Sequence, residues 1–204
     1  MPDVSGDTWE TLSSVVLAIC WGAIGVVWII GAFYNARRGP GVSERSGRDY
    51  RWLFAIAAVL LIYSDRAGVD WGGLNVPSPW IRAPGIVLLL VATAFTLWAR
   101  VALGTMWSSA VVAKSGHALR TDGPYAVTRH PIYTGLVGML LGSALAAGLG
   151  RWVAVLALGL VYFVLKARAE ERLLSGMFPE YERYRERVPQ LVPVPHHLGG
   201  LLRR

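Results

Sequence analysis

The side chains best suited to chemistry fall into two groups, and the first lies in the segment 117–133, His-Ala-Leu-Arg-Thr-Asp-Gly-Pro-Tyr-Ala-Val-Thr-Arg-His-Pro-Ile-Tyr. Gly123-Pro124 predicts a turn, because glycine tolerates positive φ and proline fixes its own. Pro131 suits the first position of a helix, where its missing N–H costs nothing. His130 then lies at or beside the N-cap, among unpaired N–H groups that favour an anion. The alternative is that this His-Pro pair only starts a helix.

The second group is the acidic pair Glu170-Glu171, which lies among the basic residues Lys166, Arg168 and Arg172. Adjacent side chains on a helix point about 100° apart, so the two carboxylates cannot share one role. One of them can face a binding site while the other pairs with a nearby arginine. Such carboxylates can bind a cationic ligand group or accept a proton.

Long apolar stretches must position these two groups. Of the 204 residues, 54% are hydrophobic and 16% are charged, which is too apolar for a soluble domain of this size. The sequence predicts an all-α fold, a polytopic membrane bundle of about five transmembrane helices. Residues 1–103 would hold three helices, and residues 104–204 a long loop, a helical hairpin and a cytosolic tail of the same structural domain. The five helices are expected at residues 12–34, 52–63, 81–103 and 131–148 and from residue 152 onward.

The last two helices are predicted to form a tight hairpin. Only Leu149 and Gly150 separate the fourth apolar stretch from the next basic residue, so the chain must fold straight back. The start of the fourth helix and the end of the fifth then meet, which brings His130 near Glu170 and Glu171. A charged cluster beside lipid indicates a functional site, because unpaired charge there is costly. The alternative is a basic belt that binds anionic lipid head groups, although the carboxylates do not favour such binding.

Small residues recur along the fourth helix. Gly138, Gly142 and Ala146 lie four residues apart, so they share one face. This stripe predicts that a neighbouring helix approaches closely along it.

Basic residues predict the orientation in the membrane. The positive-inside rule places the segment 117–130 and the C-terminus in the cytoplasm and the N-terminus outside. The excess of Arg over Lys favours a bacterial source, and with it the inner membrane. The net charge of +7 is spread between apolar stretches, which does not indicate a nucleic-acid partner. All but three of the 20 Lys and Arg residues fall in residues 35–51, 100–130 and the tail from residue 166, the exceptions being Arg66, Arg82 and Arg151.

Several common functional sites have no counterpart in the sequence. The single cysteine, Cys20, lies in an apolar stretch and provides neither a disulfide nor a cysteine-based metal site. There is no glycine-rich dinucleotide motif and no Walker lysine loop. His196-His197 lie in a proline-rich tail and form a poor metal pair, so no metal site is expected.

The motifs of the two groups, taken in order, resemble those of the isoprenylcysteine carboxyl methyltransferases and the related phospholipid methyltransferases. The resemblance covers residues 104–195, roughly the C-terminal half of the chain. The Arg-His-Pro motif alone is weak, whereas the ordered set around a tight hairpin is specific. The motifs are His117-x-Leu119, Gly123-Pro124-Tyr125, Arg129-His130-Pro131-x-Tyr133, Glu170-Glu171, Phe178-x-x-Tyr181-x-x-Tyr184 and Val188-Pro189.

The resemblance implies a cytosolic pocket for S-adenosylmethionine and a lipophilic acceptor that enters from the membrane. It also implies that Glu170 or Glu171 takes the cofactor's ammonium group. An anionic acceptor could be held by Arg129, Arg168 or Arg172, although each of these arginines could instead only set the orientation in the membrane. The residues implied for the pocket are His117 and Leu119 at the adenosine end and Tyr125, His130 and Pro131 at the methionine end, with Tyr133 as a further cofactor-binding residue.

The acceptor defines the remaining alternatives. An ionised carboxylate, as in isoprenylcysteine, needs no base, so positioning and water exclusion would supply most of the rate. A phospholipid amine or a small thiol would need deprotonation by Glu or His. A different class is a non-catalytic transport or scaffold protein, which would also keep the helical bundle. Against this class, no apolar stretch carries a string of acidic residues at its centre.

Overall fold

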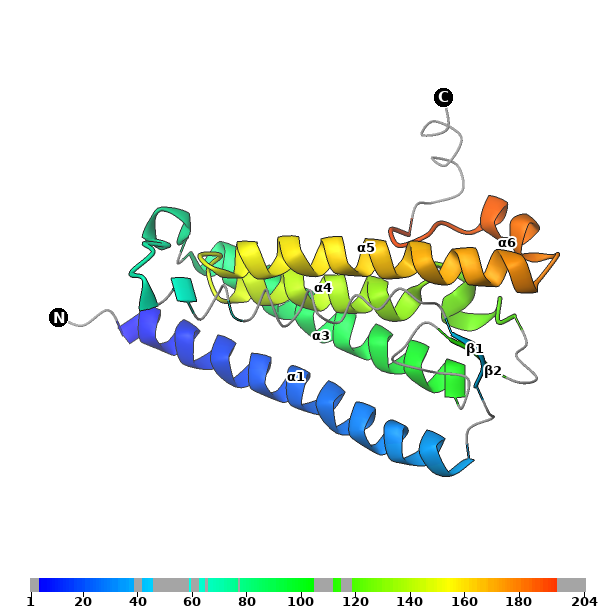
Figure 1. Ribbon diagram of the computed structural model, residues 1–204. Coiled ribbons are helices and arrows are strands. Elements are labelled where there is room, and N and C mark those ends of the chain that lie inside the picture. Colours follow the sequence, from blue (N-terminus) through cyan, green and yellow to red (C-terminus); the bar gives the residue numbers. More distant parts are fainter. Residues whose placement is uncertain are drawn as a thin grey trace.

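The computed structural model describes residues 4–38, 42–45, 59, 63–64, 66–76, 78–104, 112–114 and 119–193. These residues are mainly α-helical and form an elongated bundle (Figure 1), which confirms the all-α part of the predicted fold. The helices are α1 (Val4–Arg38), α3 (Pro79–Leu103), α4 (Pro131–Ala146), α5 (Trp152–Met177) and α6 (Tyr181–Arg187), with short 3₁₀ turns η1 (Gly72–Leu74) and η3 (Gly123–Ala126).

Two short strands join segments that the sequence analysis treats as loops. Strand β1 (Val42–Arg45) pairs antiparallel with β2 (Val112–Lys114). The pairing has a register irregularity between Val42 and Glu44. It was not predicted, because a ribbon this short depends on contacts between segments far apart in the chain.

Among the residues that the structure describes, three helices are long and apolar enough to cross a membrane: α1, α3 and α5. The apolar α4 has 16 residues, and at 1.5 Å per residue it is about 24 Å long, shorter than a typical hydrocarbon layer. The second predicted span, 52–63, lies almost entirely outside the described residues. Side chains such as Ile19, Ile30 and Phe33 on α1 are more than half exposed, as lipid-facing residues are.

Helices α3 and α4 pack backbone to backbone. A Cβ on Gly142 would lie 2.6 Å from the backbone nitrogen of Leu89, and a Cβ on Gly85 would overlap the backbone of Ala146. A Cβ on Gly138 would lie 3.0 Å from that of Ala92. The predicted small-residue stripe is confirmed, and the helix that approaches along it is α3.

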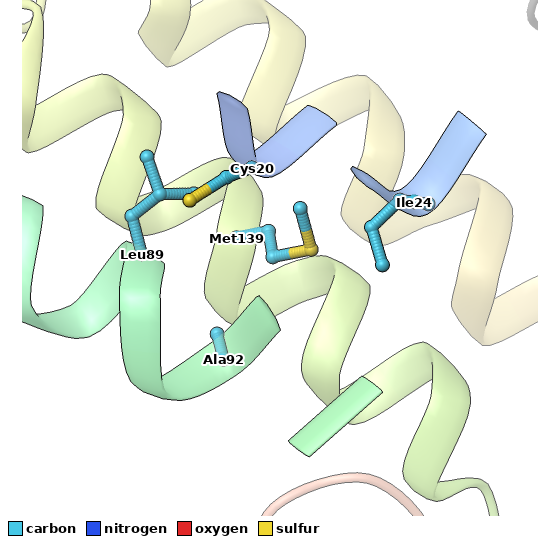
Figure 2. Packing of buried hydrophobic residues seen from close by; sticks show 5 residues of the cluster. All are labelled: Cys20, Ile24, Leu89, Ala92 and Met139. Carbon is cyan, nitrogen blue, oxygen red and sulfur yellow. The ribbon is translucent and has the colours of Figure 1, made fainter. Parts of the chain in front are cut away.

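The core of the bundle joins three helices. Figure 2 shows Cys20 and Ile24 of α1, Leu89 and Ala92 of α3, and Met139 of α4 packed together. In lipid this contact is stabilised by van der Waals packing, because the surrounding acyl chains are as apolar as the side chains themselves. Cys20 is buried and free, in agreement with the sequence analysis.

The predicted hairpin is present. Helix α4 ends at Ala146 and α5 begins at Trp152, and the two helices lie side by side (Figure 1). Leu149 has a φ of 70°, and glycines with positive φ flank it on both sides. The hairpin returns the chain to the end of the bundle where α4 begins, near α6.

Candidate functional site

His130 is the N-cap residue of α4, and Pro131 occupies the first turn, as predicted. The imidazole is buried, with 7% of the residue exposed. Its Nε2 lies 3.2 Å from Oε1 of Glu171, and its Nδ1 lies 3.5 Å from Oε2 of Glu170. The structure therefore brings the start of α4 and the far half of α5 together around one imidazole.

The two carboxylates favour the protonated form of this imidazole. Burial lowers the pKa of His130, but the hydrogen bonds and charges of Glu170 and Glu171 raise it more, so the pKa lies above its ordinary value. Each ring nitrogen of an imidazolium is a donor, which matches a carboxylate on both sides. The arrangement therefore favours an imidazolium between two carboxylates.

Glu171 belongs to the more enclosed half of this cluster. Arg129 Nε donates to its Oε1 at 2.8 Å, and both side chains are about nine-tenths buried. Arg129 Nη1 also donates to the backbone oxygens of Arg185 at 2.9 Å and Val188 at 2.6 Å. Arg129 thus links α5 to the segment after α6, and Glu171 is the glutamate that pairs with an arginine.

Glu170 belongs to the more open half. It accepts a hydrogen bond from the Tyr133 hydroxyl, and its side chain is 22% exposed, against 12% for Glu171. The Tyr133 ring stacks on His130 at 5.5 Å between centroids and on Phe163 at 5.3 Å. This aromatic stack orients the imidazole and leaves the Glu170 carboxylate as the more accessible anion.

The segment 188–191 runs beside the start of α4. The backbone N–H of Arg129 donates to Pro189 O at 2.9 Å, and that of His130 donates to Gln190 O at 3.2 Å. The Thr134 hydroxyl donates to Leu191 O at 2.6 Å. The prediction that His130 lies among unpaired N–H groups is therefore wrong for its own N–H, because the extended tail supplies the acceptor.

The remaining residues predicted for the site are Tyr125, Leu119, Arg168 and His117. Tyr125 is buried in η3, where its carbonyl accepts a hydrogen bond from the Tyr184 hydroxyl at 2.6 Å. Burial raises the pKa of Tyr125, so its phenol stays neutral. Leu119 is half-buried and Arg168 is exposed on α5, while His117 lies outside the described residues.

Some residues of the cluster were not predicted. Phe163 is one of them, and it stacks on Tyr133. Lys166, which the sequence places beside the glutamates, lies with its Nζ 5.3 Å from the centroid of the same tyrosine ring. Thr134, which anchors the tail, was also missed. A signal for Thr134 is its position one helical turn after His130, since Thr134 Oγ1 also donates to His130 O at 3.1 Å. Within the described ranges, no group of three His, Cys, Asp or Glu side chains could hold a metal ion.

Comparison with known families identifies the segment that contains this cluster. Residues 85–176 match the isoprenylcysteine carboxyl methyltransferase (ICMT) family. This segment of the chain is therefore similar to the ICMT family. The match includes most of α3, all of α4 and nearly all of α5, so it contains His130 and both glutamates. The resemblance described from the sequence is confirmed.

Three curated relatives extend the comparison. The cobalt-zinc-cadmium resistance protein CzcN of Cupriavidus metallidurans is 31% identical over 142 residues, which are 69% of this chain and 59% of that protein. The Schizosaccharomyces pombe protein-S-isoprenylcysteine O-methyltransferase is 37% identical over 102 residues, 47% of this chain and 42% of that protein. The nickel-cobalt-cadmium resistance protein NccN of Alcaligenes xylosoxydans xylosoxydans is 32% identical over 150 residues, which are 70% of this chain and 62% of that protein. The chain thus spans about half the length of the relatives that it matches. The apolar helices and the ICMT match together indicate a multi-pass membrane protein.

Proposed function

We propose that this chain is an integral membrane methyltransferase that transfers a methyl group from S-adenosylmethionine to a lipophilic acceptor. The observation that carries the proposal is the buried His130 between Glu170 and Glu171, inside the segment that matches the ICMT family. The name of the yeast relative specifies O-methylation of an isoprenylcysteine. The names of the two bacterial relatives specify resistance to metals and no reaction.

The charges of the cluster fit S-adenosylmethionine, which supplies an electrophilic methyl group when bound. Its ammonium group requires an anion, and its carboxylate requires a donor. Glu170 is the more accessible carboxylate and would take the ammonium group, because Glu171 is held by Arg129. His130, whose two ring nitrogens contact Glu170 and Glu171, would help to hold the methionine part of the cofactor. Tyr125, Pro131 and Tyr133 would shape the pocket around them.

The state of His130 favours an acceptor that needs no base. Both ring nitrogens contact carboxylates, and the pKa is raised, so at a given pH less of this imidazole is in the free-base form than of an ordinary histidine. An ionised carboxylate can attack without losing a proton, whereas an ammonium or thiol group must first be deprotonated. Because the yeast relative is also named for O-methylation, we favour O-methylation of a prenylcysteine-like carboxylate over N-methylation of a phospholipid amine or S-methylation of a thiol.

The proposed setting is the bacterial inner membrane, with the N-terminus outside and the C-terminus in the cytoplasm. The distribution of basic residues supports this orientation. The cluster would then open to the cytoplasm, where S-adenosylmethionine is made, and the acceptor would reach it from the lipid.

The test is binding of S-adenosylmethionine to the full-length protein in detergent, measured by calorimetry. Glu170→Gln keeps an acceptor for the Tyr133 hydroxyl but removes the charge. We expect at least about tenfold weaker binding, the usual effect of losing one charge-assisted hydrogen bond. The matched control is Glu182→Gln on α6. The Glu182 side chain is exposed, and its described contacts, with Arg185 and Ser175, lie outside the His130 cluster. Equal affinity in all three proteins would overturn the assignment of Glu170.

The acceptor is then identified by incubating membranes with methyl-labelled S-adenosylmethionine. Label in a base-stable lipid amine would contradict the carboxylate proposal, and label in a base-labile ester would support it. Absence of any transfer, together with absence of cofactor binding, would favour the non-catalytic alternative.

A further inference from the structure

A second site candidate lies at the opposite end of the bundle from His130. It is a cavity of about 520 Å³ between the start of α1, the η1 turn, the start of α3 and the α4–α5 turn. About 17 residues of helix separate His130 from Ala147 in the cavity wall, a distance of about 25 Å. The cavity is therefore separate from the proposed methyl-transfer site. Its volume is within the range of sites that bind small molecules.

The wall of this cavity is held by backbone hydrogen bonds between segments distant in sequence. Val76 N donates to Gly148 O at 2.9 Å, and Gly150 N donates to Leu74 O at 3.2 Å. Asn75 and Leu149 form an antiparallel bridge between them. The turn after η1 and the hairpin turn are thus tied together, which gives the cavity a fixed rim.

Three buried hydrogen-bonding groups belong to residues that line the cavity: Arg82 Nε, Ser13 Oγ and Trp71 Nε1. Within the part of the chain that the structure describes, none of these atoms has a hydrogen-bond partner. Arg82 and Ser13 are 8% and 3% exposed, so neither residue is a solvated surface side chain. Buried polar groups in native proteins nearly always have a partner, and an oxyanion in the adjoining cavity would supply acceptors if these side chains turned toward it.

The electrostatics of the cavity also favour an anion. Among the residues that the structure describes, its wall contains the cations Arg82 and Arg151 and the carboxylate of Glu10. Arg82 lies in the first turn of α3, where the helix dipole is positive and disfavours a cation. An anion beside Arg82 would be stabilised by the guanidinium and by the helix terminus together. Leu17 and Trp152 add apolar wall, which suits the rest of an amphiphile.

We propose that this cavity binds an oxyanion, a phosphate or similar group, through Arg82, Trp71 and Ser13. The anion is carried either by a lipid head group or by a free soluble phosphate. The proposal does not depend on methyl transfer, because none of its residues belongs to the His130 cluster.

The experiment uses the full-length protein in a neutral detergent and two probes: inorganic phosphate, and nanodiscs that contain phosphatidylglycerol. Binding is measured by calorimetry for phosphate and by native mass spectrometry for retained lipid. Arg82→Gln is expected to weaken binding at least tenfold, and Trp71→Phe, which removes only the indole donor, severalfold. The matched controls are Arg66→Gln, an exposed arginine near the same end, and Trp80→Phe, an indole that is 89% exposed.

The two probes distinguish the source of the anion. Binding of phosphate alone assigns a soluble ligand, and binding of phosphatidylglycerol alone assigns a lipid head group. Binding that is equal in the wild type, Arg82→Gln and Trp71→Phe would overturn the proposal, as would absence of binding with both probes. If Arg82→Gln fails to fold, Trp71→Phe against Trp80→Phe decides the question. Binding of S-adenosylmethionine, measured on the same samples, should not change.

Discussion

At the residue scale, the decisive feature is that every charge in the His130 cluster has a partner. A buried charge without a partner is strongly destabilising, whereas a complete network can be close to neutral. Glu171 contacts both His130 and Arg129, and Glu170 contacts both His130 and Tyr133. The cluster is thus stable without a ligand, and Glu170 still keeps an exposed edge for one.

The first residue-scale prediction concerns pH. Because the folded-state pKa of His130 lies above the ordinary value of 6.5, its stabilising contribution is full below about pH 6.5. The contribution is lost as pH rises through the raised folded-state pKa. As the pH rises from about 6.5 through the folded-state pKa, the melting temperature of the wild type in detergent should fall relative to that of His130→Asn. Asparagine keeps a polar N-cap but does not titrate in this pH range. Parallel profiles for the two proteins would contradict the imidazolium assignment.

The second residue-scale prediction concerns Arg129. Lysine keeps the charge but cannot reproduce the contacts that Nε makes with Glu171 and Nη1 makes with two backbone oxygens. We expect Arg129→Lys to lower the free energy of unfolding by about 1.5–3 kcal/mol, the range for hydrogen bonds to charged groups. The exposed Arg183→Lys on α6 is the control and should be near neutral. Loss of stability is read from thermal melts, and equal melts would show that the network is not stabilising.

At the element scale, function depends on how closely helices approach one another. The backbones of α3 and α4 touch at glycines, and the α4–α5 hairpin then aligns His130 with the two glutamates. In lipid, where apolar burial provides little driving force between helices, this close approach is a main source of stability.

The element-scale prediction tests that approach. Gly142→Ala places a Cβ 2.6 Å from the Leu89 backbone nitrogen, so the helices must separate. We expect a loss of about 1–3 kcal/mol, typical of an overpacked contact. In Gly25→Ala on α1, the new Cβ would have no neighbour within 4 Å in the described part of the chain, and the change should be neutral or slightly stabilising because alanine favours helix. A pair of variants with equal melting temperatures would contradict the packing that we describe.

At the scale of the whole molecule, the bundle has two chemically different ends. One end holds the paired charges of His130 and α5, together with α6 and the tail. The other holds the cavity that Arg82 lines, close to the start of α1. Such a chemical difference between the two ends would suit a protein that binds a different ligand on each side of a membrane.

The whole-molecule prediction is that the two termini lie on opposite sides of the membrane. The sequence predicts five crossings, and the structure describes three of them as long apolar helices. Five crossings would place Met1 outside and Arg204 in the cytoplasm under the positive-inside rule. Reporter tags fused at Met1 and Arg204, read by alkaline phosphatase and fluorescence assays, should give opposite results. Two cytoplasmic tags would refute the count of five.

The sequence by itself determined the features that depend on local composition. Apolar length predicts the helices, Pro131 predicts the start of α4, and the two-residue gap before Arg151 predicts the hairpin that joins His130 to the glutamates. Only the tertiary structure decided that Glu171 is the glutamate paired with Arg129 and that the segment 188–191 covers the start of α4. It also decided that Arg82, which the sequence analysis assigned to topology, lines a cavity. These outcomes depend on helix rotation and on contacts between distant segments, which local periodicity does not encode.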